Sequence, residues 1–116
     1  MKRQAAEARG RSAEDEAAAW LEARGWDILA RRVKVKAGEI DLVARREGLV
    51  AFVEVKWRAR AADLDHAIDE YRLCRVAAAA EAVAPEYATG GEDMRIDVLL
   101  LAPGQEPRHI ENAWMP

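Results

Sequence analysis

Apolar residues recur at helical spacing near the start of the chain and again after its middle. The first pattern follows Ser12, a residue that can cap a helix, and predicts a helix over residues 13–24. The second predicts a helix over residues 63–84, which Pro85 ends. Alternating or continuous apolar runs predict strands at residues 28–36, 39–46, 49–57 and 94–102, with a short edge strand at 108–113. This order indicates an α/β fold in one domain, residues 1–116, of which residues 1–10 are expected to be flexible.

The stretch GEIDLVARREGLVAFVEVKW, residues 38–57, reads as a hairpin whose two-residue turn is Glu47-Gly48. That turn fixes the register, and places Asp41 directly opposite Glu54. It also makes one face of the hairpin wholly apolar, because side chains alternate along a strand. The expected pairs on that face are Ile40 with Val55, Leu42 with Val53 and Ala44 with Ala51, and Glu39 is expected opposite Lys56 on the other face.

Two carboxylates at directly opposite positions destabilise a sheet unless something positive lies between them. A hard divalent cation such as Mg²⁺ would compensate Asp41 and Glu54, since it accepts carboxylate oxygens. Lys56 would point into the same site, where it could orient or activate a water molecule or neutralise a phosphate oxygen. The alternative is an exposed strand face on which the two acids are simply hydrated. Val43 and Phe52 continue this face and favour partial burial.

Glu14 borders the apolar stripe of the first predicted helix, because it precedes Ala17, Ala18 and Leu21 at helical spacing. It could lean toward the sheet as a further ligand of a metal or of water. The alternative is an acid in the first turn that complements the helix dipole.

The composition is typical of a globular, soluble chain, with 51% hydrophobic and 34% charged residues. A single cysteine, Cys74, excludes an internal disulfide and suits a reducing compartment. The N-terminus has no secretory signal pattern, and the apolar run at residues 96–102 is too short to span a bilayer. We therefore expect a cytoplasmic protein without membrane association.

Charge is unevenly distributed along the chain. Residues 31–60 carry 9 basic and 4 acidic groups, a net +5, while residues 61–116 carry 4 basic and 11 acidic groups, a net −7. A basic region around a cluster of acids suits a polyanion that must meet a metal. The candidates for contact with backbone phosphates are Arg31, Arg32, Lys34 and Lys36, for which a solvated strand edge is the alternative.

Four segments together resemble one known family: GRSAEDEAAAWLEARGWDIL, GEIDLVA, VAFVEVKWR and the closing RIDVLLL with HIENAW. The chain is similar to the YraN-type family of small bacterial proteins, an uncharacterised, nuclease-like branch of the PD-(D/E)XK superfamily near the archaeal Holliday-junction resolvases. The resemblance covers Gly10 to Trp114. It implies a restriction-endonuclease-like core, ordered helix-strand-strand-strand-helix-strand, with a mixed central sheet flanked by helices.

The resemblance also implies Mg²⁺- or Mn²⁺-dependent hydrolysis of DNA phosphodiesters, on branched or otherwise structured DNA, with no small-molecule cofactor. The motif acid of the superfamily falls on Asp41, its D/E-x-K on Glu54 and Lys56, and the helix acid of the resolvase-like branch on Glu14. The backbone carbonyl of Val55 is implied as a further metal ligand. Resolvase-like relatives imply a homodimer.

The chain departs from the family pattern after the EVK strand. Arg58 is kept, but the usual Phe-Gly turn is replaced by ARAADLDHAID, which bears on how a substrate is positioned. A lysine-rich start of the second helix is replaced by Arg72 and Arg75, which can still contact phosphate. The main hypothesis is a metal-dependent endonuclease. The alternatives are a non-catalytic nucleic-acid-binding module with the same fold, and an interaction subunit whose acidic second half docks a protein partner.

Overall fold

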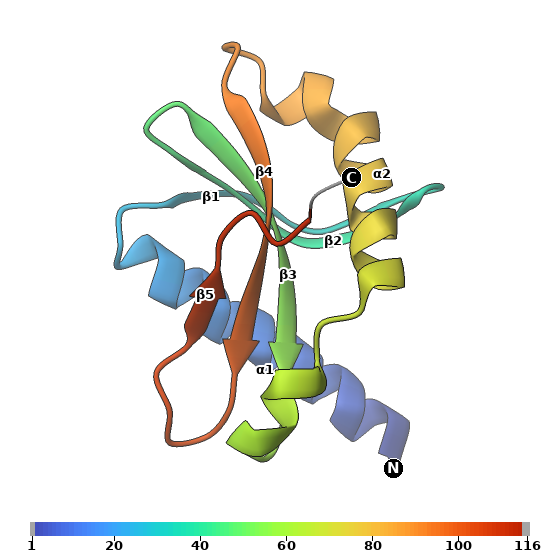
Figure 1. Ribbon diagram of the computed structural model, residues 1–116, viewed down its shortest axis with the longest axis vertical. Helices are drawn as coiled ribbons and strands as arrows, with labels where there is room; N and C mark the ends of the chain where they lie inside the picture. The colour runs from blue at the N-terminus through green and yellow to red at the C-terminus, as the bar shows by residue number, and fades with distance from the viewer. Residues whose placement is uncertain (1, 115–116) are drawn as a thin grey trace.

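The computed structural model describes residues 2–114, with side chains from Ser12 onward. A five-stranded mixed sheet lies between two helices, α1 on one face and α2 on the other (Figure 1). The predicted α/β class and element order are confirmed, and the arrangement is consistent with a restriction-endonuclease-like core. In chain order the elements are α1 Lys2–Glu22, β1 Asp27–Val35, β2 Gly38–Arg46, β3 Leu49–Trp57, the 3₁₀ helix η1 Ala61–His66, α2 Glu70–Tyr87, β4 Asp93–Leu101 and β5 Arg108–Ile110.

The strands follow one another across the sheet in chain order, β1-β2-β3-β4-β5. Every neighbouring pair is antiparallel except β3 and β4, which are parallel. Parallel neighbours need a long crossover, and η1 with α2 supplies it. The crossover carries α2 over one face of the sheet, which leaves the other face to α1 (Figure 1).

The turn between β2 and β3 is the two-residue turn predicted from the sequence. Glu47 and Gly48 both have positive φ, 48° and 78°, as a type I′ turn requires. The register that follows is confirmed over its first half, with Leu42 paired with Val53 and Val43 paired with Phe52.

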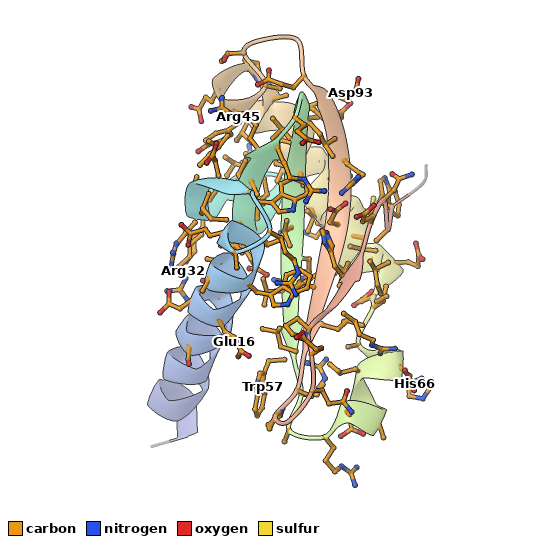
Figure 2. The ribbon with its side chains drawn as sticks, turned by 90° about the vertical axis from the view of Figure 1, so that its left-hand side faces the viewer. Glu16, Arg32, Arg45, Trp57, His66 and Asp93 are labelled. Carbon is orange, nitrogen blue, oxygen red and sulfur yellow. The ribbon has the colours of Figure 1, made fainter. Side chains whose placement is uncertain are left out.

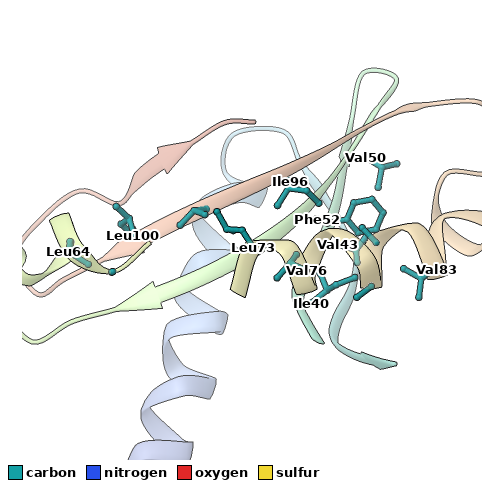
Figure 3. Close-up of a cluster of buried hydrophobic side chains, with 14 of the residues drawn as sticks. Ile40, Val43, Val50, Phe52, Leu64, Leu73, Val76, Val83, Ile96 and Leu100 are labelled. Carbon is teal, nitrogen blue, oxygen red and sulfur yellow. The ribbon is translucent and has the colours of Figure 1, made fainter. Parts of the chain in front are cut away.

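Two clusters of buried apolar side chains lie on the two faces of the sheet. The cluster under α2 is built around Phe52, whose complete burial is worth roughly 1.5–3 kcal/mol (Figure 3). The labelled members of this cluster are Ile40, Val43, Val50, Phe52, Leu64, Leu73, Val76, Val83, Ile96 and Leu100. The cluster under α1 contains Ala13, Ala17, Ala18, Leu21, Trp26, Leu42, Ala44, Ala51, Val53, Leu99 and Leu101.

Both predicted helices have different bounds in the structure. The first begins at Lys2, so Ser12 lies inside it and does not cap it, because residues 2–9 are strong helix formers that extend the helix toward the N-terminus. Residues 2–10 belong to this helix and Met1 lies outside the described residues, so the flexibility of residues 1–10 stays a prediction.

The second predicted helix is divided in two. Residues 61–66 form η1, and α2 begins only after Asp69, whose carboxylate accepts the N–H groups of Tyr71 and Arg72. The helix also continues past Pro85 to Tyr87, since the following Ala88 N–H still donates to the Ala84 carbonyl at 2.8 Å. Among the described residues, no helix is long and apolar enough to cross a membrane.

Candidate active site

The two strands that carry the predicted acids separate at the acids themselves. Pairing of β2 with β3 ends at Leu42 and Val53, and β2 then follows β1 away from β3 toward α2 (Figure 1). Beyond that point Asp41 Oδ2 accepts the Val55 N–H at 2.8 Å. A side chain therefore takes the place of a backbone partner, and a fork opens between β2 and β3.

The fork changes which residues share a face. Arg32, the β1 residue across from Asp41, has a left-handed φ of 54°, and the regular alternation of side chains along β2 is interrupted at the same level. Ile40 consequently packs under α2, whereas Leu42 packs under α1. The prediction that Ile40 and Leu42 share one apolar face was wrong, and so was the directly opposite placement of Glu39 and Lys56. Glu39 is paired instead with Lys34 of β1.

Asp41 and Glu54 form a buried acid pair at this fork, with only 7% and 2% of their surfaces exposed. Burial and, next, the charge of Glu54 raise the pKa of Asp41 to about 7, against the lowering effect of the Val55 N–H. Glu14 adds a smaller increase to the same pKa. Near neutral pH the Asp41 carboxyl is therefore partly protonated, and a cation could take the place of this proton. The alternative of two hydrated acids on an exposed face is wrong.

Two cationic side chains contact Glu54 from different elements. Lys56 Nζ lies 3.6 Å from Glu54 Oε1, and Arg72 Nε of α2 lies 3.3 Å from the same oxygen. Burial lowers the pKa of Arg72, but the charge and the hydrogen bond of Glu54 outweigh it and raise that pKa overall. Arg72, expected as a phosphate contact, is therefore a neighbour of the acid pair.

Glu14 approaches the same region from α1. It lies more than three turns into that helix, so the interpretation as a first-turn acid that complements the dipole was wrong. Its Oε2 lies 3.0 Å from Arg32 Nε (Figure 2, where Arg32 is labelled beside α1). Burial raises the pKa of Glu14 more than Arg32 lowers it, and Glu39 raises it as well.

The other predicted phosphate contacts fall into two groups. Arg31 is held by α1, with its Nη1 2.6 Å from Asp15 Oδ1, and Arg58 donates to the Trp57 carbonyl at 2.8 Å. Lys34 and Arg75 line a cleft between β1 and α2, while Lys36 is exposed in the turn after β1.

Sequence reasoning missed a further buried acid away from the fork, Asp97 of β4, which is completely buried. Arg95 contacts both its oxygens at 2.7 and 2.8 Å, His109 Nε2 lies 2.7 Å away, and the Asn112 N–H donates at 2.9 Å. Burial raises the pKa of Asp97, but the hydrogen bonds from His109, Arg95 and Asn112 together lower it. These bonds tie β4 to β5 and to the turn that follows. The sequence does contain a signal for this buried acid, because Asp97 is the one acidic residue inside the apolar run RIDVLLL.

The donor set at the fork suits a cation bound by two carboxylates. Among residues 12–114, no group of three or more His, Cys, Asp or Glu side chains is placed to hold a metal ion. Mg²⁺, however, is commonly held by one or two carboxylates and completes its shell with waters and substrate phosphate. Asp41 and Glu54 supply this minimum, and two buried carboxylates side by side fit a divalent cation. Glu14 is oriented toward Arg32, so its role as a ligand stays a prediction, as does that of the Val55 carbonyl.

Comparison with known proteins places these residues in a family. Residues 13–101 match the model of the uncharacterised protein family UPF0102. The chain belongs to this family. Two UPF0102 proteins, from Erythrobacter litoralis and Sphingopyxis alaskensis, are 71% and 62% identical over 116 residues, all of both chains. A third, from Rhizorhabdus wittichii, is 56% identical over 113 residues, 97% of this chain and 96% of the relative. UPF0102 is the YraN-type, PD-(D/E)XK nuclease-like family, so the resemblance drawn from the motifs is confirmed.

Proposed function

We propose that this UPF0102 protein is a metal-dependent endonuclease that hydrolyses phosphodiester bonds of DNA at the fork between β2 and β3. The observation that carries the proposal is the buried Asp41–Glu54 pair, in which the pKa of Asp41 is raised to about 7. Such a pair destabilises the folded protein at neutral pH unless a cation is bound. Strongly perturbed acids in a fork with adjacent cationic side chains are typical of catalytic sites.

In this proposal Asp41 and Glu54 hold the divalent cation, Mg²⁺ or Mn²⁺. The cation supplies charge neutralisation at the phosphate and lowers the pKa of a water molecule. Lys56 lies beside Glu54, close enough to orient the attacking water or to neutralise a phosphate oxygen. Arg72 contacts Glu54 in the absence of substrate, and its side chain can turn to bind the negatively charged phosphate when substrate is present. Glu14 would polarise water from the α1 side.

A cleavage panel tests the proposal. Labelled single-stranded, duplex, flap and four-way-junction DNA are incubated with the protein and Mg²⁺ or Mn²⁺, and the products are resolved on denaturing gels. Wild type should cut at least one substrate, and Glu54→Gln should cut none. Lys56→Ala should lose turnover while it keeps Mg²⁺ affinity, measured by calorimetry. Equal cutting by Lys56→Ala and wild type would contradict the assignment of Lys56.

One observation favours a second candidate, a nucleic-acid-binding module without catalysis. Lys56 and Arg72 together already compensate Glu54, so its charge is balanced without a metal ion. This candidate predicts salt-sensitive binding of DNA that Asp41→Asn leaves unchanged. Cutting that depends on Mg²⁺ and is lost in Glu54→Gln would exclude it.

A further inference from the structure

Two exposed apolar side chains lie close in the chain to Arg72, which contacts the acid pair. Among the described residues, the large hydrophobic side chains that are exposed are Ile68, Tyr71 and Met94, at 37%, 73% and 47%. Tyr71 is in the first turn of α2 and directly precedes Arg72, the residue that contacts Glu54. Ile68 precedes the same helix, whereas Met94 is near the start of β4. An aromatic ring this exposed, on the helix turn that contacts the candidate site, suggests a ligand with a flat apolar face.

A basic cleft leads away from the acid pair along the same helix. It has a volume of about 230 Å³, and its charged lining consists of Lys34, Arg72 and Arg75 against the single acid Glu39. Backbone contact closes the cleft at its base, because a Cβ on Gly38 would lie only 2.7 Å from the Arg75 carbonyl oxygen. The cleft is therefore a defined depression between the start of β2 and α2, and its charge suits a run of phosphates.

Tyr71 lies on the helix that forms one wall of this cleft, although it is not among the lining residues. It lies four residues before Arg75 on α2, and residues four apart are neighbours on the surface of a helix. Arg75 lines the cleft, and Arg72 joins the cleft to Glu54. The exposed ring of Tyr71 and the cations Arg72 and Arg75 thus lie within about a turn of one another on α2, and Arg72 contacts Glu54 of the acid pair.

We propose that the cleft binds unpaired nucleotides, with phosphates along Lys34, Arg72 and Arg75 and a base stacked on Tyr71. The proposal rests on the proposed function, and names its substrate class as single-stranded segments, including those at flaps and junctions. A paired duplex keeps its base faces stacked on one another and offers only its backbone, so it cannot use the Tyr71 ring. An unpaired base of any identity can use it, which predicts binding without strong sequence preference.

Binding measured in EDTA tests this inference separately from catalysis. Fluorescence anisotropy compares a short oligothymidine, an oligouridine of equal length and a matched duplex, at several salt concentrations. Wild type should bind a single strand more tightly than the duplex. Tyr71→Ala should weaken single-strand binding about fivefold or more, the loss of one base stack, and leave the duplex and the salt dependence unchanged. Tyr71→Trp should retain binding.

Two variants serve as controls. Met94→Ala removes an exposed apolar side chain of β4 and should change nothing. Arg75→Ala should weaken binding to every nucleic acid and reduce the salt slope by about one phosphate contact. Equal affinity for single strand and duplex, or a Tyr71→Ala variant that binds like wild type, would overturn the inference even if the protein cuts DNA. Selective, Tyr71-dependent binding without any cleavage would instead support the cleft and overturn the nuclease. Binding to either oligothymidine or oligouridine supports the cleft, and the ratio of the two affinities separates DNA from RNA.

Discussion

Replacing Asp41 with asparagine should stabilise the protein while it removes the proposed activity. In the folded protein the Asp41 carboxyl keeps its proton up to a pKa of about 7, against 3.8 as the ordinary value. Between those two pH values the unfolded chain is ionised at this residue and the folded protein is not, so rising pH favours unfolding. An asparagine can still accept the Val55 N–H through its side-chain oxygen, and it can donate to Glu54 without any charge.

The size of the effect follows from the same two pKa values. A shift from 3.8 to about 7 corresponds to a destabilisation on the order of 4 kcal/mol at pH values above 7. At pH 5 the same destabilisation is only roughly 1.7 kcal/mol, because ionisation of Asp41 then stabilises the unfolded chain less. The free energy of unfolding of Asp41→Asn minus that of wild type should therefore grow by about 2 kcal/mol between pH 5 and pH 7.

Urea unfolding in EDTA at pH 5, 6, 7 and 8 measures this difference, with circular dichroism as the readout. Asp27→Asn, which changes an exposed aspartate at the start of β1, is the matched control and should show no pH-dependent difference from wild type. A difference that stays constant from pH 5 to pH 8, or a variant less stable than wild type at pH 8, would refute the reasoning. The acid pair would then not hold a proton at neutral pH.

Three further results are expected. Mg²⁺ at about 100 times its dissociation constant should raise the free energy of unfolding of wild type by roughly 2.7 kcal/mol at pH 8 and leave that of Asp41→Asn unchanged. Thermal unfolding measures both, and an equal rise in the two proteins would mean that the ion binds elsewhere. Asp97→Ala should lower the free energy of unfolding by about 1–3 kcal/mol, since it removes the completely buried carboxylate that binds Arg95, His109 and the Asn112 N–H. An effect under about 0.5 kcal/mol would contradict that role. Gly38→Ala should lower the free energy of unfolding by about 1–3 kcal/mol, because the added Cβ meets the Arg75 carbonyl oxygen, and it should widen the cleft. If this variant has the stability and the single-strand affinity of wild type, the close approach of Gly38 to Arg75 is contradicted.

The sequence predicted the sheet better than the helices, and local turn chemistry is the reason. Glu47-Gly48 specifies a two-residue turn, and that turn sets the pairing of Leu42 with Val53 correctly. The helix bounds depend on weaker preferences. Residues 2–9 extend α1 to the N-terminal side of Ser12, and Asp69 rather than Asp63 caps the start of α2. Capping residues mark where a helix can begin, but packing and propensity choose among them.

The sequence predicted that Asp41 and Glu54 lie close together, as they do in the structure, but the geometry around them was not predictable. The two acids were expected opposite each other in a regular ladder, whereas the strands separate there and Asp41 binds the Val55 N–H. Arg32, across from Asp41 on β1, has a left-handed conformation at the same level, for which no local pattern gives a signal. The contact of Arg72 with Glu54 joins residues from a strand and from the crossover helix, and single-sequence periodicity carries no information about such tertiary contacts.

The hairpin that carries the acid pair also bears on how the chain folds. β2 and β3 are adjacent in the chain and can associate within microseconds, whereas β4 reaches β3 only after the crossover is in place. Asp41 and Glu54 thus meet first in a hydrated hairpin in which both are ionised. They lose water when α2 and β4 pack, so a proton must be taken up late in folding at neutral pH. Folding is then a proton-consuming reaction, and its last step should become faster in mildly acidic solution.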